Sequence, residues 1–189
     1  KTDQIEFMSD YIRIWCNKPY AYKTAKENKK EPKYIVQSEK YDKQYGTYAE
    51  RMEEFKKRGD KVWWYVCWEP QDPYTNILME QKGVVHRVLF WQQKQYNVDG
   101  FLYYAVNNWT ENAWEDAITG KHLMPHVYGD GVLIYDGAHV GIRGPVGSLR
   151  LEAVRDGIED FEYLTMAEKE LGKKKTNKII KKVSKSILD

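Results

Sequence analysis

Short apolar runs alternate with helix-like segments along this chain, and the alternation is the first indication of its fold. Runs rich in β-branched and aromatic residues predict strands, because such side chains fit a pleated surface. Segments whose apolar residues recur every three or four positions predict helices. The predicted strands cover 11–16, 61–68, 101–107 and 131–135, and the predicted helices cover about 39–58, 76–96, 148–171 and 176–188.

Two of the predicted helices carry informative residues. The first has a single apolar stripe, formed by Tyr41, Tyr45, Tyr48, Met52 and Phe55. The long helix near the end of the chain begins after Ser148, a residue type that caps helices well. It also contains Gly157, which costs about 1 kcal/mol relative to Ala inside a helix. That cost suggests that another element packs closely against this glycine.

Strands that alternate with helices form parallel βαβ units. Four such units amount to half of a (β/α)8 barrel, since a complete barrel takes about 250 residues. We therefore expect an α/β fold that is half of a TIM-type barrel, with about four parallel strands and flanking helices. A doubly wound sheet fits the same pattern, although no glycine-rich phosphate-binding turn follows a predicted strand.

Composition narrows the class of protein. The 189 residues are 42% hydrophobic and 31% charged, which suits one folded unit with a sizeable core. No apolar run approaches the roughly 18 residues of a membrane-spanning helix, so we expect no membrane partner. Cys16 and Cys67 lie in apolar runs and are expected to be buried free thiols. Lys1 opens the chain without an initiator Met or a secretion signal, so we expect a fragment or a processed piece.

The positive charge is concentrated at the end of the chain. Of 30 Lys and Arg residues, seven lie together at Lys173, Lys174, Lys175, Lys178, Lys181, Lys182 and Lys185. Without them, residues 1–172 hold 23 basic against 27 acidic side chains. This mildly acidic body argues against a nucleic-acid partner. We expect two parts, the barrel half over 1–172 and a solvated basic helix over 173–189.

In α/β folds of either kind, ligands bind at the carboxyl ends of the parallel strands. This rule selects 16–18, 67–70, 107–109 and 135–137, which combine aromatic, amide and carboxylate side chains. Aromatic faces pack on the apolar face of a pyranose, and amides and carboxylates bind its hydroxyls. These segments therefore suit a sugar, with Trp109 the aromatic most expected to touch it.

Candidate acids and bases are few. Glu69 follows a strand end between Trp68 and Pro70, an apolar setting typical of carboxyl groups that act as acids. It is a catalytic candidate, and an enzyme of another class would pair it with Asp136. No serine lies in a nucleophile elbow.

The histidines do not indicate a metal or a cofactor. His122 and His126 flank Pro125 and so do not share a helical face, and neither has a nearby Glu or Cys partner. His86 is expected to be structural, and His139 lies near the predicted site without an obvious partner.

Several segments, in order and spacing, resemble the catalytic domain of glycoside hydrolase family 123. They are WWYVC at 63–67 with Pro70, PYTN at 73–76, GFLYYAVNNW at 100–109, GDGVLIY at 129–135, GPVGSLRLE at 144–152 and RDGIEDFEYL at 155–164. The resemblance covers about residues 10–165 and implies the C-terminal half of a (β/α)8 barrel. It also implies β-N-acetylgalactosaminidase-type chemistry, in which the substrate's own 2-acetamido oxygen attacks the anomeric carbon. The parent protein would then be secreted or bound to the cell surface.

The family uses an adjacent Asp-Glu pair: Asp orients the acetamido group and Glu protonates the leaving oxygen. This chain has no Asp-Glu dipeptide, so the pair is expected on an earlier strand, and the chain alone is expected to be inactive. The expected sugar-binding residues are Trp109, Asn107, Trp68, Glu69, Tyr65, Tyr103 and Arg150. The alternative is a non-catalytic module that binds carbohydrate or associates with itself or with an N-terminal barrel half, since half a barrel exposes two strand edges.

Overall fold

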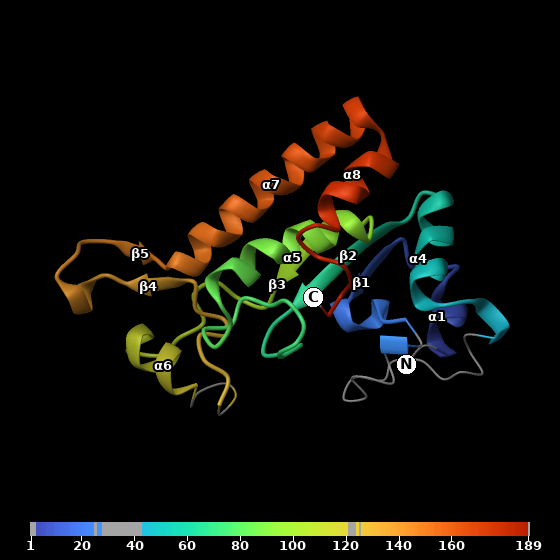
Figure 1. Ribbon diagram of the computed structural model, residues 1–189. Helices are drawn as coiled ribbons and strands as arrows, with labels where there is room; N and C mark the ends of the chain where they lie inside the picture. Colours follow the sequence, from blue (N-terminus) through green and yellow to red (C-terminus); the bar gives the residue numbers. More distant parts are fainter. Residues whose placement is uncertain (1–2, 25, 28–42, 121–123, 125, 189) are drawn as a thin grey trace.

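The fold is mixed α/β and contains a three-stranded parallel sheet in the order β1-β2-β3. The computed structural model describes residues 3–24, 26–27, 43–120, 124 and 126–188 (Figure 1). The three strands are β1 (Ile14–Asn17), β2 (Lys61–Val66) and β3 (Gly100–Tyr103). Helix α4 (Tyr48–Lys57) precedes β2, and helix α5 (Gly83–Gln95) connects β2 to β3.

The remaining elements lie before β1, directly after β1, and after β3. They are α1 (Asp3–Met8), the 3-10 helix η1 (Pro19–Tyr22), α6 (Ala113–Thr119), β4 (Ile134–Asp136), the 3-10 helix η3 (Ala138–Val140), β5 (Pro145–Gly147), α7 (Leu149–Leu171) and α8 (Lys173–Ile180). Within the described ranges, no helix is both long and apolar enough to cross a bilayer.

The fourth predicted strand does not join the parallel sheet. It forms β4, which pairs antiparallel with β5, so that Tyr135 lies opposite Val146. Only residues 137–144 separate the two strands, which is enough for a hairpin but too short for the crossover that parallel strands need. The expectation of about four parallel strands is therefore wrong for this strand, and the described residues form no closed barrel.

Local capping explains where the helices depart from their predicted bounds. Thr47 caps α4 by accepting from the Glu50 N–H, so this helix begins at Tyr48, and the predicted start of its stripe at Tyr41 lies outside the described residues. Helix α5 begins at Gly83 instead of near residue 76, because Asn76 is fully buried and binds loop backbone. β3 ends at Tyr103, earlier than predicted.

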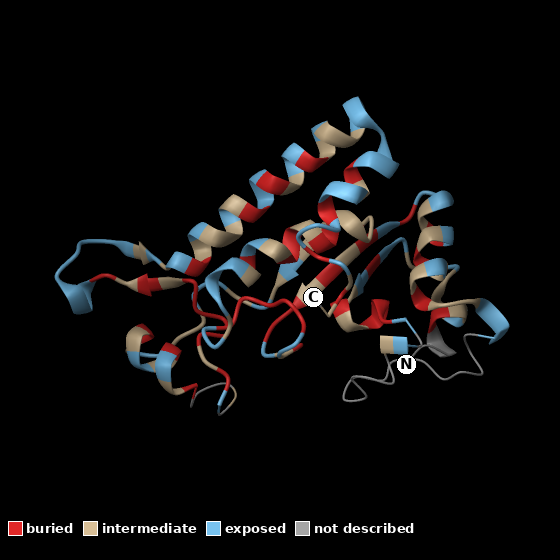
Figure 2. Cartoon of the chain, viewed as in Figure 1, coloured by how far each residue is buried: buried red, intermediate tan, exposed pale blue. Residues whose placement is uncertain are grey.

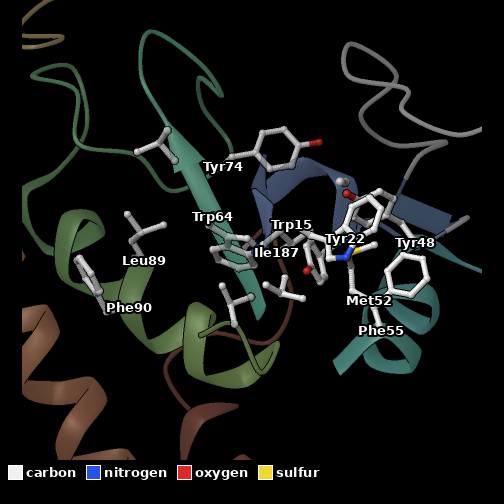
Figure 3. Packing of buried hydrophobic residues seen from close by; sticks show 14 of the residues in the cluster. Trp15, Tyr22, Tyr48, Met52, Phe55, Trp64, Tyr74, Leu89, Phe90 and Ile187 are labelled. Atoms are coloured by element: carbon white, nitrogen blue, oxygen red, sulfur yellow. The ribbon is translucent and has the colours of Figure 1, made fainter. Parts of the chain in front are cut away.

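The main core covers one face of the parallel sheet (Figure 3). Trp64 of β2 is fully buried, and the ring of Tyr22 meets it edge to face with centroids 5.4 Å apart. Ile187, near the C-terminal end of the described chain, is fully buried in the same cluster. Figure 2 shows the same distribution, with buried residues along β2 and on the side of α5 that faces the sheet.

The opposite face of the sheet is largely open. Side chains alternate between faces along a strand, and the register places five apolar or thiol residues on this open face. They are Ile14, Cys16, Trp63, Tyr65 and Leu102, of which Ile14 is 57% and Leu102 45% exposed. Both cysteines are free, but Cys16 is exposed, contrary to the expectation of burial, whereas Cys67 is buried. Cys16 is therefore accessible to solvent on this face of β1, as Ile14 is.

Helix α7 lies along α5 (Figure 1). Gly157 of α7 is buried, and a Cβ at that position would overlap the ring of Phe90 in α5. Close packing was the reason predicted for this glycine, and the contact with Phe90 confirms it. Asp160, one turn further along, accepts hydrogen bonds from Arg87 Nη2 at 2.8 Å and Trp91 Nε1 at 2.8 Å.

Candidate functional site

A cluster of polar and aromatic groups lies at the carboxyl ends of β1, β2 and β3. Lys18 follows β1 directly, and its ammonium donates to Cys67 Sγ at 2.9 Å and to the Glu69 carbonyl at 3.1 Å. The same ammonium lies 4.3 Å from the centroid of the Tyr65 ring, a cation–π contact. Burial is the main cause that raises the pKa of Tyr65, and a hydrogen-bonding contact with Cys67 adds to it. This phenol therefore stays protonated at neutral pH.

Asp130 is the carboxyl group of this cluster, and it was not among the predicted site residues. It is 4% exposed, and its Oδ1 has no hydrogen-bond partner in the described part of the chain. Burial raises the pKa of Asp130. Four groups act in the opposite direction and lower it: the Tyr103 hydroxyl, the Lys18 charge and the N–H groups of Gly131 and Trp68. The available sequence signal was an Asp between two glycines immediately before an apolar run, which permits close backbone approach.

Tyr103 fixes the loop that carries Asp130. Its hydroxyl accepts from the Gly131 N–H at 3.0 Å and donates to the Gly129 carbonyl at 3.5 Å. Burial raises the pKa of Tyr103, and the nearby charge of Asp130 acts in the same direction. The end of β3 therefore sets the position of the acidic loop relative to Lys18.

A buried amide holds the loop that follows β2. Asn76 Nδ2 donates to the Cys67 carbonyl at 2.8 Å and to the Pro70 carbonyl at 2.7 Å. The two carbonyls lie on either side of Trp68 and Glu69 in the sequence. Trp68 is 39% exposed, and Glu69 is half-buried. Trp68 thus presents an open aromatic surface at the rim of the cluster.

The remaining predicted residues lie apart from this cluster. The Trp109 indole donates to the Ile134 carbonyl at 3.0 Å and packs with Trp114 and Tyr135 in a second, smaller apolar cluster. Asn107 is exposed and forms an isolated bridge with Val132. The structure therefore gathers Tyr65, Trp68, Glu69 and Tyr103 around Lys18, and groups Trp109 with β4.

Arg150 links these two regions from the first turn of α7. It is 7% exposed, and its Nη1 donates to the Ile77 carbonyl at 2.9 Å and the Gly129 carbonyl at 2.7 Å. Its Nη2 donates to the Val132 carbonyl and lies 3.4 Å from the Tyr135 hydroxyl. The guanidinium thus joins the loop before α5 to the loop that carries Asp130.

The second predicted acid has local partners. Asp136 accepts from the Ala138 N–H at 3.0 Å, and its Oδ2 lies 3.2 Å from His139 Nδ1, so His139 has a partner that its sequence position did not reveal. In the part of the chain that the structure describes, no group of three His, Cys, Asp or Glu residues is arranged to hold a metal ion. His122 lies outside the described residues.

Chemically, the cluster combines the kinds of group that bind polyhydroxylated rings. An ammonium and a carboxylate oxygen with a free lone pair can engage hydroxyl groups as donor and acceptor. An exposed indole beside them offers a flat apolar face. Such a site supplies recognition, while bond cleavage in a glycosidase also requires a positioned acid.

Comparison with known protein families agrees with this chemistry. The family model for the glycoside hydrolase 123 catalytic domain matches residues 15–167, which is most of the chain and includes Lys18, Tyr65, Tyr103 and Asp130. A search of curated proteins found no match.

Proposed function

The chain belongs to the glycoside hydrolase 123 catalytic-domain family, and from that premise we propose that it forms the sugar-binding half of a glycosidase for N-acetylhexosamine glycans of the N-acetylgalactosamine type. The family match carries the proposal. The cluster of Lys18, Asp130 and Trp68 supports it, because these groups suit a pyranose.

We further propose that this sheet is the C-terminal half of a (β/α)8 barrel. Three parallel strands with intervening helices support the assignment, as does the apolar open face bearing Trp63 and Leu102, which suits a barrel interior. An Asp-Glu pair on an earlier strand of the same barrel would face the cluster described above. Because glycans of this type occur outside cells, we place the enzyme outside the cell or at its surface.

The proposed reaction is substrate-assisted hydrolysis. The 2-acetamido carbonyl oxygen forms a bond to the anomeric carbon while the glycosidic bond breaks, and the acid of the pair gives its proton to the leaving oxygen. Water then attacks the anomeric carbon and breaks its bond to the acetamido oxygen, while the carboxylate left by the acid of the pair takes the proton from the water, which restores both the acid and the acetamido group. In this chain, Asp130 and Lys18 would hold ring hydroxyls, and Trp68 would pack on the apolar face of the sugar.

Binding of methyl N-acetyl-β-galactosaminide to the purified chain tests the recognition half of the proposal. We expect binding in an NMR titration, with Asp130→Asn weakening it about tenfold because the amide replaces one acceptor oxygen by a donor. Asp136→Asn is the matched control and should leave the affinity unchanged. Absence of binding by the folded wild-type chain would contradict the proposal.

Turnover of 4-nitrophenyl N-acetyl-β-galactosaminide tests where the acid lies. We expect no release of nitrophenol by the purified chain or by Glu69→Gln, because the acid is proposed to lie on an earlier strand. Turnover that Glu69→Gln abolishes would show that Glu69 is the catalytic acid and that the proposed pair is not needed.

A further inference from the structure

The C-terminal segment carries a concentrated positive charge that the function proposed above does not use. Residues 171–188 contain no acidic side chain, and seven lysines of this segment are exposed: Lys173, Lys174, Lys175, Lys178, Lys181, Lys182 and Lys185. We call these seven residues the lysine surface. Among the residues that the structure describes, none of the seven forms an ion pair, whereas Arg155 of α7 pairs with three acids.

The lysine surface belongs to a packed segment of the chain. Ile180 in α8, and Ser184 and Ile187 after it, are fully buried. Gln92 of α5 donates through Nε2 to Ser184 Oγ at 3.1 Å and to the Ser186 carbonyl at 3.0 Å. The backbone that carries the lysines is therefore held against α5, and their charges are kept close together.

This concentration of charge opposes the fold. Lys173, Lys174 and Lys175 lie in the first turn of α8, where the helix dipole disfavours positive charge. Lys174 and Lys178 are four positions apart, and like charges at that spacing destabilise a helix. Charges of both signs would solvate the helix without this repulsion. The arrangement therefore favours a negatively charged partner, which would relieve the repulsion.

Aliphatic side chains are exposed beside the lysines. Leu171 is 46% exposed, Ile179 39% and Val183 48%. On an anionic bilayer, lysines bind the headgroups while neighbouring apolar side chains enter the boundary between headgroups and acyl chains. A soluble polyanion would engage only the lysines. The combination of both kinds of side chain favours a lipid surface.

The lysine surface lies far from the Asp130 cluster. Arg150, in the first turn of α7, donates to the Gly129 carbonyl next to Asp130. Helix α8 follows the opposite end of α7, which is about 35 Å long (Figure 1). Residues 1–172 hold 27 acidic against 23 basic side chains, so a negatively charged surface would attract the α8 end of the molecule.

We infer that the lysine surface docks the chain on an anionic lipid bilayer, on which it lies peripherally. The lysines bind the phosphate headgroups, and Ile179 and Val183 enter the boundary region. The inference goes beyond the proposed function, because docking at α8 leaves the carboxyl ends of the strands facing away from the bilayer.

Co-sedimentation of the purified chain with lipid vesicles tests the inference. We expect vesicles of phosphatidylcholine with about 30% phosphatidylglycerol to bind the chain at least about tenfold more tightly than vesicles of phosphatidylcholine alone. Raising the salt concentration from about 0.1 M to about 0.5 M should weaken this binding at least about tenfold, because ions screen the attraction. Equal binding to both kinds of vesicle, or binding to neither, would overturn the inference.

A double variant tests the lysines directly. Lys178→Gln combined with Lys182→Gln should weaken binding to the anionic vesicles about 25-fold, at about fivefold for each lysine. Lys43→Gln combined with Lys82→Gln removes two exposed lysines elsewhere and should have no effect. Equal weakening by the two double variants would show a general charge effect and overturn the inference.

Urea denaturation of the Lys178→Gln and Lys182→Gln variant tests the repulsion. The variant should be at least as stable as wild type, because like charges have been removed from one helical segment. A less stable variant would show that these lysines serve the fold, which would overturn the argument for a partner.

The aliphatic residues distinguish a bilayer from a soluble polyanion. Ile179→Thr combined with Val183→Thr should weaken binding to the anionic vesicles about threefold or more, because polar side chains enter the boundary region less favourably. The same variant should bind dextran sulfate as wild type does, which also shows that it is folded. If the variant binds the vesicles as tightly as wild type, the lysines recognise any polyanion and the docking on a bilayer is overturned.

Discussion

At the residue scale, the absence of one side-chain carbon at Gly157 sets how closely α7 approaches α5. We expect Gly157→Ala to lower the free energy of unfolding by about 1–3 kcal/mol, because the added methyl group must displace the Phe90 ring in a packed interior. Urea denaturation measures this change. Gly83→Ala is the matched control, since nothing lies within 4 Å of a Cβ there, and it should be neutral or stabilising. Equal effects of the two variants would argue against the packing explanation.

Residue-scale prediction from sequence succeeded where one property decides the outcome. Gly157 was predicted to mark close packing because glycine is costly inside a helix, and Phe90 is the reason for it. Asp130 was missed because its importance depends on burial and on two groups distant in the sequence, Lys18 after β1 and Tyr103 in β3, which only the folded chain brings together. The role predicted for Trp109 remains a prediction, and its hydrogen bond to Ile134 gives it a structural partner.

At the element scale, Asp160 connects α7 to α5 through Arg87 and Trp91. Hydrogen bonds from Arg87 lower the pKa of Asp160, so its stabilising effect is present above the unfolded-state value of about 4 and is lost as pH falls through the lower folded value. We expect Asp160→Asn to cost about 1–3 kcal/mol at pH 7. The difference from wild type should shrink below about pH 4 in chemical denaturation across pH.

A control on the same helix separates this contact from general charge effects. Asp156 pairs with the exposed Arg155, and solvent screens an exposed pair of this kind, so it adds little to stability. Asp156→Asn should therefore change stability little at any pH. If the free energy of unfolding of Asp160→Asn falls with decreasing pH in parallel with that of wild type, the role given to Asp160 is contradicted.

Elements were predicted well where the apolar pattern repeats over many residues and the capping residue lies next to the helix in the sequence. Helix α7 begins after Ser148 and ends at Leu171, as its pattern and cap indicated. The type of the 131–135 strand was correct, but its partner was not, because strand pairing depends on the short connection to β5. The predicted start of α5 was too early. Asn76 donates to the Cys67 and Pro70 carbonyls and so holds a loop, and the spacing of apolar residues does not reveal such side-chain bonds.

At the scale of the whole molecule, the open face of the sheet has a measurable chemical consequence. Cys16 lies on that face and is exposed, whereas Cys67 is buried beside Lys18. Burial of part of its surface raises the pKa of Cys16, so alkylation is best followed near pH 9, where more thiolate is present. We expect iodoacetamide to modify Cys16 at least about tenfold faster than Cys67, as peptide mass spectrometry would show.

Cys16→Ser provides the control for this experiment. The variant should react slowly in native buffer and rapidly in urea, because only Cys67 remains. Adding the proposed N-terminal barrel half to the wild-type chain should protect Cys16. Slow modification of Cys16 in the chain alone would show that the face is already covered, as self-association would cover it.

Helix α7 is held at three points along its length. With 23 residues the helix is about 35 Å long, and near its middle Gly157 packs against the Phe90 ring of α5. On one side, Arg150 grips the Ile77 and Gly129 carbonyls, and on the other Glu168 is tied to Lys94 at 2.6 Å. We therefore expect that breaking the Lys94–Glu168 contact shifts the Asp130 loop through α7.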